Sequence, residues 1–507
     1  MPSYEVFNKN KINVLRRLAE KAYEGSVDSN TPNDIAKELF PGHKPEYRCC
    51  VYKEREIIRQ RTNLAMGHKP DGHEITPGQM VYVIEAACDD CDIHKVRITD
   101  NCRKCLFKPC QSACHFGAIF QGNSKMHIDY SKCKTCGMCA KVCAYGAILI
   151  SERPCKRSCP TGALKHFTDE IAFINEPECI SCGRCAASCP FGAISEVSYL
   201  VPVIDAIKQE GKKVVAMVAP AVMGQFGKCT LNQVYSAIKA LGFDEVVEVA
   251  KGADLTTVSE AEEALKAKAE GRKLTTSCCP AFVELIKMKF PKVYAENTSD
   301  TLSPMAITAR MVKKENPDCV TVFVGPCVAK KKEITLEKNK GFVDYVITFE
   351  ELNAMFQAKE IVVSEQPDEN IGVANGSKSG RNFCQSGGVA KSLNDYLAEK
   401  GVETRLTLKA ADGSEMCIEY LKQLNAGKQE EDVLEGMMCQ GGCISGVCSL
   451  VTNPLLIKRD AEKENAKTLG TNISDVIKTT EGVETTYEKN WYKIKNDQYY
   501  KKEKSLK

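Results

Sequence analysis

Three short loops in the second half of the chain carry cysteines in an arrangement suited to an iron–sulfur cluster. Their sequences are Thr276-Ser277-Cys278-Cys279-Pro280, then Gly325-Pro326-Cys327-Val328-Ala329-Lys330-Lys331-Lys332-Glu333, then Met437-Met438-Cys439-Gln440-Gly441-Gly442-Cys443-Ile444-Ser445-Gly446. Each loop follows a strand-like run, and sites in α/β sheets usually lie where strands end. Cysteine thiolates are the ligands that iron–sulfur clusters require, and glycines let the backbone approach a bulky group. The loops therefore predict one buried cluster site.

In this order, the motifs T-S-C-C-P, P-C-x-x-K-K-x-E and M-x-C-x-G-G-C-x-x-G resemble the three signature loops of the iron-only ([FeFe]) hydrogenases. The likeness spans roughly residues 215–450. A single C-x-x-x-C would be a weak match, but three ordered loops at domain-scale spacing are specific. The resemblance implies a two-lobed α/β catalytic domain that holds the H-cluster, a [4Fe-4S] cluster joined to a diiron subcluster with carbonyl, cyanide and dithiolate ligands.

The resemblance also assigns roles within these loops. Four cysteines would bind the [4Fe-4S] part, and the sulfur of Cys443 would also bridge to the diiron subcluster: Cys279, Cys327, Cys439 and Cys443. Lys330 matches a lysine that hydrogen-bonds a cyanide. Ala219-Pro220-Ala221 matches the backbone segment that faces the other cyanide. Met437 and Phe383 match apolar wall positions, and the alternative for this pair is an ordinary place in the core.

Cys278 is not expected to bind iron. A thiol of low pKa near a helix N-terminus can relay protons, and the family counterpart of Cys278 delivers them to the cofactor. Local matching continues the path through a hydroxyl, either Thr298 or Ser299, and through Glu260 and Glu263. The alternative for both glutamates is a solvated position on a charged helix.

The match to the family has several departures around the expected diiron site. Gly325, Ala329, Phe282 and Met305 stand where well-studied members carry methionine, serine, tryptophan and glutamine, and Ala267 replaces the arginine that ends the proton path. These changes remove bulk and hydrogen bonds. They indicate a divergent branch of the family in which rate and oxygen tolerance differ.

Between Cys88 and Ile194, a C-x-x-x-C followed by a Gly-Ala-Ile or Gly-Ala-Leu tail recurs four times. The pattern resembles two-cluster bacterial ferredoxins, in which the fourth cysteine of each motif ligates the other motif's cluster. We predict one such unit inserted into the first motif of another, giving four [4Fe-4S] sites. The inner unit would use Cys102, Cys105, Cys110 with Cys143, and Cys133, Cys136, Cys139 with Cys114. The outer unit would use Cys179, Cys182, Cys185 with Cys159, and Cys88, Cys91, Cys155 with Cys189.

Zinc is the structural alternative for any C-x-x-C pair, but the triple spacing and the repeated tails favour iron–sulfur clusters. The site that uses Cys88 and Cys91 has the weakest pattern, and His94 or His115 is an alternative ligand there.

Composition agrees with a reduced, metal-binding protein. The 507 residues include 28 cysteines, carry a net charge of +3 and contain no long apolar run. Dense disulfides belong to short secreted chains, so we expect a cytoplasmic protein without nucleic-acid or membrane partners. We predict a helical region at 1–80, nested α+β ferredoxin-like domains at 81–198, an α/β catalytic domain at 199–451 and a tail at 452–507. Leu15, Leu18 and Ala22 share a helix face, and Thr31-Pro32 begins a second helix.

The sequence therefore predicts an [FeFe] hydrogenase that catalyses 2H⁺ + 2e⁻ ⇌ H₂, with electrons passing through accessory clusters from ferredoxin or a similar redox protein. The family also implies maturation proteins as partners. Two alternatives remain: a non-catalytic relative such as the eukaryotic iron–sulfur assembly factors, and a hydrogen-sensing regulator. Retention of Cys278, Lys330 and the Gly-Gly-Cys443 loop disfavours the first, and no PAS or kinase module supports the second.

Overall fold

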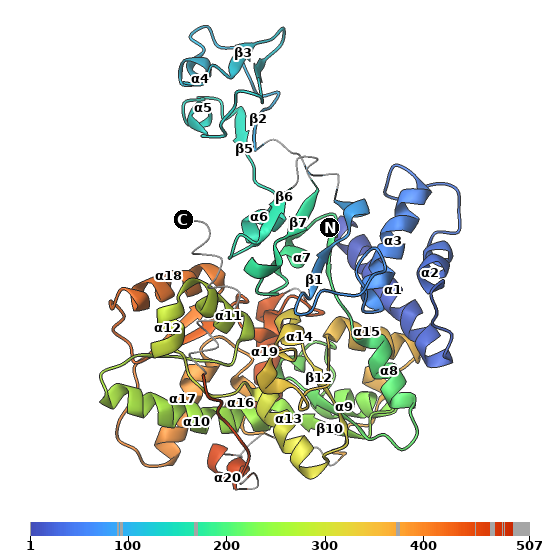
Figure 1. Ribbon diagram of the computed structural model, residues 1–507, viewed down its shortest axis with the longest axis vertical. Helices are drawn as coiled ribbons and strands as arrows, with labels where there is room; N and C mark the ends of the chain where they lie inside the picture. Colours follow the sequence, from blue (N-terminus) through green and yellow to red (C-terminus); the bar gives the residue numbers. More distant parts are fainter. Residues whose placement is uncertain are drawn as a thin grey trace.

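The N-terminal region is helical and lies against the α/β part of the molecule (Figure 1). The computed structural model describes residues 2–88, 91, 95–166, 171–371, 376–451, 453–466, 472–478, 480 and 482–489. The first three helices are α1 (Pro2–Glu24), α2 (Thr31–Leu39) and α3 (Val51–Ala65). Leu15, Leu18 and Ala22 are buried, as their spacing predicts, in one core with residues of α8 (Leu200–Lys208) and α15 (Phe349–Ala358). The helical region therefore packs on the α/β part, which comprises residues 199–451.

The two ferredoxin-like units are nested, and each contains two antiparallel strand pairs. In the inner module, residues 95–150, β2 pairs with β5 and β3 with β4; its elements are β2 (Val96–Ile98), α4 (Pro109–Ser112), β3 (Ile119–Gln121), β4 (Met126–Ile128), α5 (Met138–Lys141) and β5 (Ile148–Ile150). In the outer module, β1 pairs with β8 and β6 with β7; its elements are β1 (Val81–Val83), α6 (Pro154–Ser158), β6 (Leu164–His166), β7 (Ala172–Ile174), α7 (Arg184–Ser188) and β8 (Ile194–Glu196). Figure 1 shows the inner module projecting away from the rest.

The α/β part contains two parallel sheets. The four-stranded sheet has the order β10-β9-β12-β13, and the three-stranded sheet has the order β11-β15-β14. The strands are β9 (Val214–Val218), β10 (Glu245–Glu248), β11 (Leu274–Thr275), β12 (Val320–Val324), β13 (Tyr345–Ile347), β14 (Leu408–Asp412) and β15 (Val433–Met437). β9 and β12 are buried at every residue, as expected for β-branched strands covered on both faces. This agrees with the two-lobed α/β fold that the family likeness implies.

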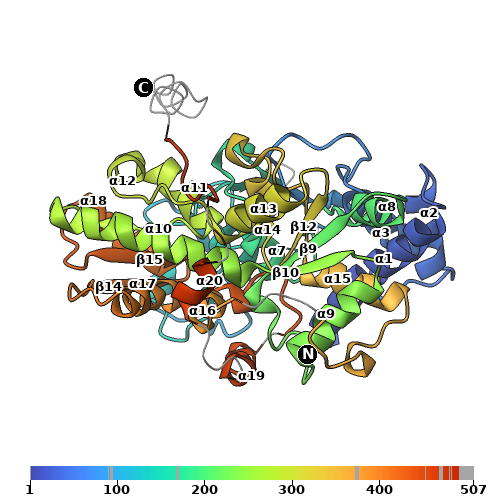
Figure 2. The same ribbon diagram turned by 90° about the horizontal axis from the view of Figure 1, so that it is seen from below.

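Helices cover both sheets, and the longest helix of the α/β part is α10 (Val249–Ala269). The other helices not yet given are α9 (Leu231–Ala240), α11 (Pro280–Lys289), α12 (Pro291–Glu296), α13 (Pro304–Glu315), α14 (Val328–Glu333), α16 (Lys378–Asn382), α17 (Gly388–Glu399), α18 (Ser414–Asn425), α19 (Pro454–Ala466) and α20 (Ile473–Ile477). Figure 2 shows α10 (Val249–Ala269) running along the molecule, where it packs against α13 and α17. Thr348 and Glu351 form a capping box at the start of α15, as the Thr-x-x-Glu pattern of the sequence predicts.

Short 3₁₀ turns complete the backbone, at Glu85–Ala87, Glu176–Glu178, Pro220–Val222, Glu337–Asn339, Val363–Glu365 and Cys443–Ser445. The described parts of the C-terminal segment pack on the α/β part. Ile457 lies in the largest core cluster, and Thr486 forms an isolated antiparallel β-bridge with Thr301. In the described residues, no helix is both long and apolar enough to span a membrane.

Candidate iron–sulfur site

Four cysteines from loops that follow strands of both sheets converge in the α/β part. Cys327 follows β12 and caps α14, whereas Cys279 caps α11, which comes after β11. Cys439 and Cys443 come from the loop after β15. Between them, Gly442 has φ +90°, and a Cβ there would lie 2.7 Å from the carbonyl oxygen of Cys384. Only glycine fits this turn, which brings Cys443 back beside Cys439.

The four cysteines are half-buried and lie within electrostatic reach of one another. Burial raises the pKa of Cys443 well above its usual value, and the nearby thiols Cys279, Cys327 and Cys439 raise it further. Four sulfurs crowded together are unfavourable as free thiolates but match the donor set of a cubane. The sequence contains no histidine after His166, so the donors here are sulfur alone.

Cys278 lies beside this quartet but faces a small apolar cluster. It packs against Ala253, Phe383, Val389 and Met437, so the two predicted wall residues, Phe383 and Met437, do lie together next to it. The expected low pKa of Cys278 is wrong. Burial, then the negative charge of Glu260, raises its pKa well above the usual thiol value. The helix N-terminus does not offset this desolvation, and Cys278 therefore remains a protonated thiol.

Glu260 is fully buried on α10 and is held by the residue that precedes Cys278. Its Oε1 accepts hydrogen bonds from Ser277 N at 2.9 Å and from Ser277 Oγ at 3.0 Å. Burial raises the pKa of Glu260 to about 8. Its Oε2 has no hydrogen-bond partner within the described part of the chain. The solvated alternative therefore does not apply to Glu260, and the role of Ser277 was missed because only the fold brings it to Glu260.

Glu263, one helical turn further along α10, is hydrogen-bonded to Ser299. Ser299 Oγ donates to Glu263 Oε2 at 2.5 Å, and Asp300 N donates to Oε1 at 3.0 Å. The hydroxyl of Thr298 donates instead to the carbonyl of Val293. The sequence left open whether Thr298 or Ser299 contacts the glutamate. In the structure it is Ser299 that hydrogen-bonds Glu263.

Lys330 is buried and forms an ion pair with the last residue of its own motif. Its Nζ lies 2.6 Å from Glu333 Oε2 and 3.0 Å from Ser303 Oγ. Burial alone would lower the pKa of Lys330, but Glu333 outweighs it and the pKa is raised. Neither Glu333 nor Ser303 was predicted from the sequence, although the glutamate belongs to the P-C-x-x-K-K-x-E motif.

The glycines and aromatic rings explain two departures from the family pattern. A Cβ at Gly325 would lie 2.6 Å from the Phe323 ring and 3.2 Å from the Cβ of Ala219. Ala219, followed by the turn that contains Pro220 and Ala221, hydrogen-bonds the carbonyl of Val324. The space of a longer side chain at position 325 is thus taken by Phe323. In the same way, the ring of Phe282 fills the space beside Gly436.

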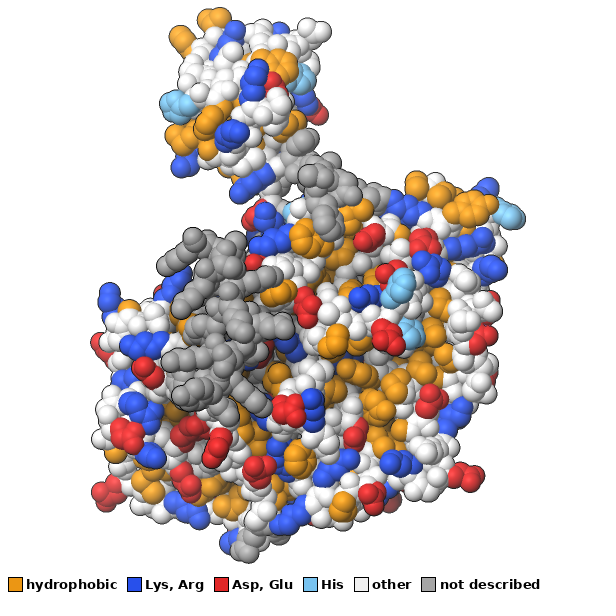
Figure 3. Space-filling view, viewed as in Figure 1, with side chains coloured by type: hydrophobic (Ala, Val, Ile, Leu, Met, Phe, Trp, Pro, Cys, Tyr) orange, Lys and Arg blue, Asp and Glu red, His pale blue; other side chains and the backbone are white. Residues whose placement is uncertain are grey.

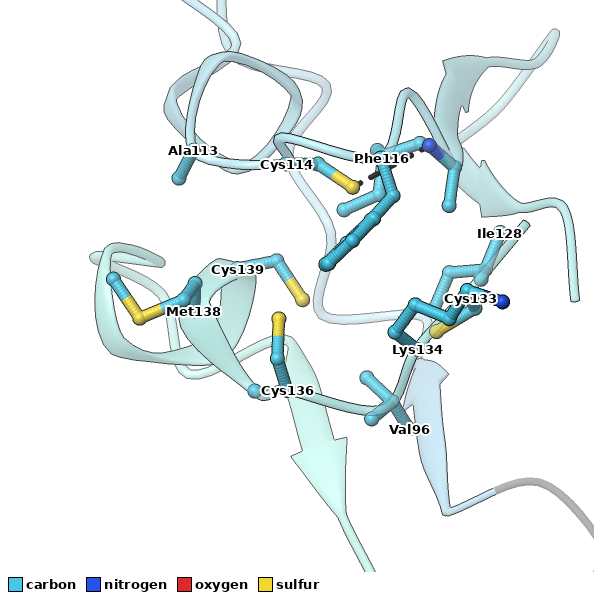
Figure 4. Close-up of a pocket in the computed structure, with 13 residues that line it drawn as sticks. Val96, Ala113, Cys114, Phe116, Ile128, Cys133, Lys134, Cys136, Met138 and Cys139 are labelled. Atoms are coloured by element: carbon cyan, nitrogen blue, oxygen red, sulfur yellow. Dashed lines mark hydrogen bonds between the residues drawn. The ribbon is translucent and has the colours of Figure 1, made fainter.

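The inner module brings both predicted quartets together. One cavity is lined by Cys102, Cys105, Cys110 and Cys143, and a second by Cys114, Cys133, Cys136 and Cys139. Figure 4 shows the sulfurs of Cys136 and Cys139 pointing into the same gap. Cys114 Sγ accepts a hydrogen bond from Ala118 N at 3.4 Å, which explains the Gly-Ala tail: glycine turns the chain so that this N–H faces the sulfur.

The outer module brings the other two quartets together. Burial raises the pKa of Cys155 to about 12, and Cys189, Cys91 and Cys88 add to the rise. Burial raises the pKa of Cys182 to about 12 as well, with Cys179 and Cys159 contributing; Cys185 lies in the same group. Of the alternative ligands, His115 is exposed in the inner module, and His94 lies outside the described residues.

One outer quartet lies directly against the quartet of Cys279, Cys327, Cys439 and Cys443. Cys182 packs in the same apolar cluster as Cys279 and Cys327, and its charge affects the pKa of Cys439. Arg184 Nη1 donates to Ser414 Oγ at 2.6 Å, and Lys332 Nζ donates to the carbonyl of Cys179 at 2.9 Å. The fold and the cysteines therefore define an iron–sulfur protein in which ferredoxin-like modules lead to a buried sulfur site.

Comparison with known families makes this class more specific. Residues 212–447 match the family "Iron only hydrogenase large subunit, C-terminal domain". Residues 125–148 match a 4Fe-4S binding domain, and residues 150–200 match the LdpA Fe-S cluster-binding domain. Residues 212–447 therefore resemble the large-subunit domain of the iron-only hydrogenases, and they follow residues that resemble iron–sulfur cluster-binding domains.

Among characterised proteins, the chain is 28% identical over 403 residues to iron hydrogenase 1 of Clostridium pasteurianum, covering 69% of this chain and 68% of that protein. It is 27% identical to the NADP-reducing hydrogenase subunit HndD of Solidesulfovibrio fructosivorans, covering 69% of this chain and 63% of that subunit. Over 161 residues it is 27% identical to the cytosolic Fe-S cluster assembly factor NAR1 of Kluyveromyces lactis, covering 32% of this chain and 30% of that factor. A solved [FeFe]-hydrogenase HydA1 from Chlamydomonas reinhardtii aligns with a TM-score of 0.45 at 21% identity, covering 56% of this chain and 98% of that one.

Proposed function

We propose that the protein is a cytoplasmic [FeFe] hydrogenase that interconverts protons, electrons and H₂. One observation carries the proposal: the half-buried quartet of Cys279, Cys327, Cys439 and Cys443 has a proton-bearing thiol, Cys278, on one side and a further cysteine quartet on the other. The interconversion of protons and H₂ needs a source of protons and a source of electrons at the same point.

The residues present fit the H-cluster. The four sulfurs of the quartet would hold its [4Fe-4S] part, and Cys443 would be the link to the diiron part. When bound, this group supplies the metal site at which protons and electrons combine or H₂ is split. Cys278, Phe383 and Met437 form an apolar wall, which excludes water from that side.

Residues of α10 would move protons to Cys278. Glu260, with its pKa of about 8, is protonated at neutral pH and can donate. Its Oε1 is fixed by Ser277, which leaves Oε2 for exchange with a neighbouring group. Glu263, bonded to Ser299, lies one turn along the same helix towards its C-terminus. A buried acid with a pKa near the working pH suits general acid–base transfer.

Lys330 would serve as a fixed cation in the pocket. Glu333 and Ser303 hold its ammonium group, so it can lend a hydrogen bond to a small anionic ligand without moving the helix. The backbone at Ala219, Pro220 and Ala221 would lie against the opposite side of the bound group. Four accessory [4Fe-4S] clusters, in the quartets of the inner and outer modules, would carry electrons.

A non-catalytic role is the main alternative, since the chain is also similar to an iron–sulfur assembly factor. The two roles are separated by infrared spectroscopy of protein made with hydrogenase maturation proteins. A hydrogenase shows carbonyl and cyanide bands together with H₂ turnover. If fully iron-loaded protein showed no carbonyl or cyanide bands, that result would contradict the proposal. Bands with negligible turnover would favour a hydrogen sensor instead.

A further inference from the structure

The inner module is strongly basic in a chain that is otherwise acidic. Residues 95–150 contain nine lysines and arginines but only two aspartates, a formal charge of +7, whereas the whole chain carries +3. The remainder therefore carries −4. Both aspartates already have partners in the module: Lys125 lies 2.7 Å from Asp100, and Lys132 lies 3.1 Å from Asp129. Two oxidised cubanes with their thiolates would add about −2 each, which still leaves the module positive.

The same module exposes much apolar surface. Of the eighteen large hydrophobic side chains that are exposed in the described part of the chain, ten lie in these 56 residues. Leu106 and Phe107 are the most exposed of all, at 88% and 89%. Figure 3 shows orange and blue side chains next to each other on the projecting module. Apolar residues surrounded by charge are typical of surfaces that bind another protein.

Leu106 and Phe107 occupy the one irregular spacing among the complete cysteine motifs. They lie between Cys105 and Cys110, where the chain has four residues in place of the usual two. The next residue, Lys108, has φ +46°, so the backbone turns sharply after the pair. Cys105, Lys108 and Cys110 line the same cysteine cavity. A protein bound on Leu106 and Phe107 would therefore lie next to a cluster.

We propose that this surface docks a small acidic electron carrier, a protein with a one-electron cluster or flavin, with Leu106 and Phe107 as the apolar anchor. The proposal rests on the proposed function because it assumes clusters in the inner module. The positive charge would speed and orient the encounter, and the anchor would slow dissociation. The charge alone would also suit a nucleic acid, but the cysteine cavities beside the anchor favour a redox protein.

The test uses the full-length, cluster-loaded protein and an acidic two-cluster bacterial ferredoxin as the probe. In Leu106→Ser/Phe107→Ser, the Kd for the ferredoxin should rise at least tenfold while iron content stays the same. Tyr52→Ser, at a side chain 74% exposed on α3, is the matched control and should change nothing. Lys141→Glu should weaken binding at low salt, whereas Lys212→Glu on the α/β part should not. Affinity should fall as salt rises.

Catalytic assays distinguish this proposal from the proposed function. The double variant should raise KM for reduced ferredoxin and leave H₂ evolution from reduced methyl viologen unchanged, because the viologen does not need a docking site. Suppose the wild-type protein binds ferredoxin, the double variant does not, and neither evolves H₂ with reduced methyl viologen. That result would support the docking surface and contradict the proposed hydrogenase function. Unchanged ferredoxin affinity in the variant, or tighter binding of single-stranded RNA than of ferredoxin, would overturn the docking proposal.

Discussion

Glu260 Oε1 accepts two hydrogen bonds from Ser277, one from its backbone N–H and one from its hydroxyl. Ser277 directly precedes Cys278 in the chain. The contact therefore fixes the position of the first cysteine loop relative to α10. It also leaves a carboxylic acid of raised pKa beside a thiol of raised pKa, so both groups keep their protons at neutral pH.

The raised pKa of Glu260 predicts a pH-dependent stability. Glu260 has a pKa of about 8 in the folded state and 4.5 when unfolded. Between these values the folded state holds a proton that the unfolded state has lost. Its contribution is complete below pH 4.5 and is lost as pH rises to about 8, at about 1.4 kcal/mol per pH unit. Glu260→Gln should remove this slope. Unfolding temperatures measured anaerobically at several pH values test it, and parallel curves for both proteins would refute it.

Replacing Cys278 should stop proton transfer without affecting the cofactor. Cys278→Ala should keep the carbonyl and cyanide infrared bands while H₂ turnover falls at least about a hundredfold, the scale of lost general acid–base catalysis. Cys319→Ala, at a buried thiol in another core cluster, is the control and should retain turnover. Wild-type turnover in Cys278→Ala would exclude the relay. Cys443→Ala should lose the bands, since it removes the proposed link to the diiron group.

Cys179→Ser should impair electron delivery but not chemistry at the catalytic site. Its quartet lies beside Cys439 through Cys182, so electrons from outside would pass through it. Hydrogen–deuterium exchange needs no net electron flow and should persist, whereas ferredoxin-dependent turnover should fall. An equal loss of both activities would count against this order of clusters.

Iron analysis tests the number of clusters. Four accessory cubanes, the catalytic cubane and the diiron group together contain about 22 iron atoms per chain. Cys88→Ser should lower the iron content by about four atoms and should do so without affecting the inner module. If Cys88 and Cys91 bind zinc or only pack in the core, the wild type would contain about 18 iron atoms and the variant the same number.

Lys11 should anchor the N-terminal region. The side chain of Lys11 is only 12% exposed, and its ammonium lies 2.7 Å from Glu196 and 2.6 Å from Glu350, so it connects α1 with both the outer module and α15. Lys11→Met leaves the buried carboxylate of Glu196 and the half-buried carboxylate of Glu350 without their cation and should cost about 3–5 kcal/mol. Hydrogen exchange in α1 should rise as a result. Arg16→Met, at a partly exposed ion pair within the helix, is the control. Unaltered exchange in α1 of Lys11→Met would refute the anchor.

What the sequence could predict depended on how local each feature is. The strands before Cys279, Cys327 and Cys439 and the capping box at Thr348 follow from short patterns, and the structure contains all of them. The choice between Thr298 and Ser299 required the position of α10, which no short pattern encodes. The pKa of Cys278 was predicted with the wrong sign because helix position was weighed without burial. The contacts of Lys11 join residues 185 and 339 positions apart, beyond the reach of any local motif.

The pairing of β1 with β8 sets an order in which the protein can mature. Val81 pairs with Glu196, and the whole inner module lies between them. Both cysteine quartets of the inner module are complete once residue 143 has been made, whereas the outer module still lacks Cys189 and its closing strand. Because domains tend to fold as units during synthesis, the inner module can take up its clusters on the ribosome. The quartet that includes Cys88 has to stay open until more than a hundred further residues have emerged.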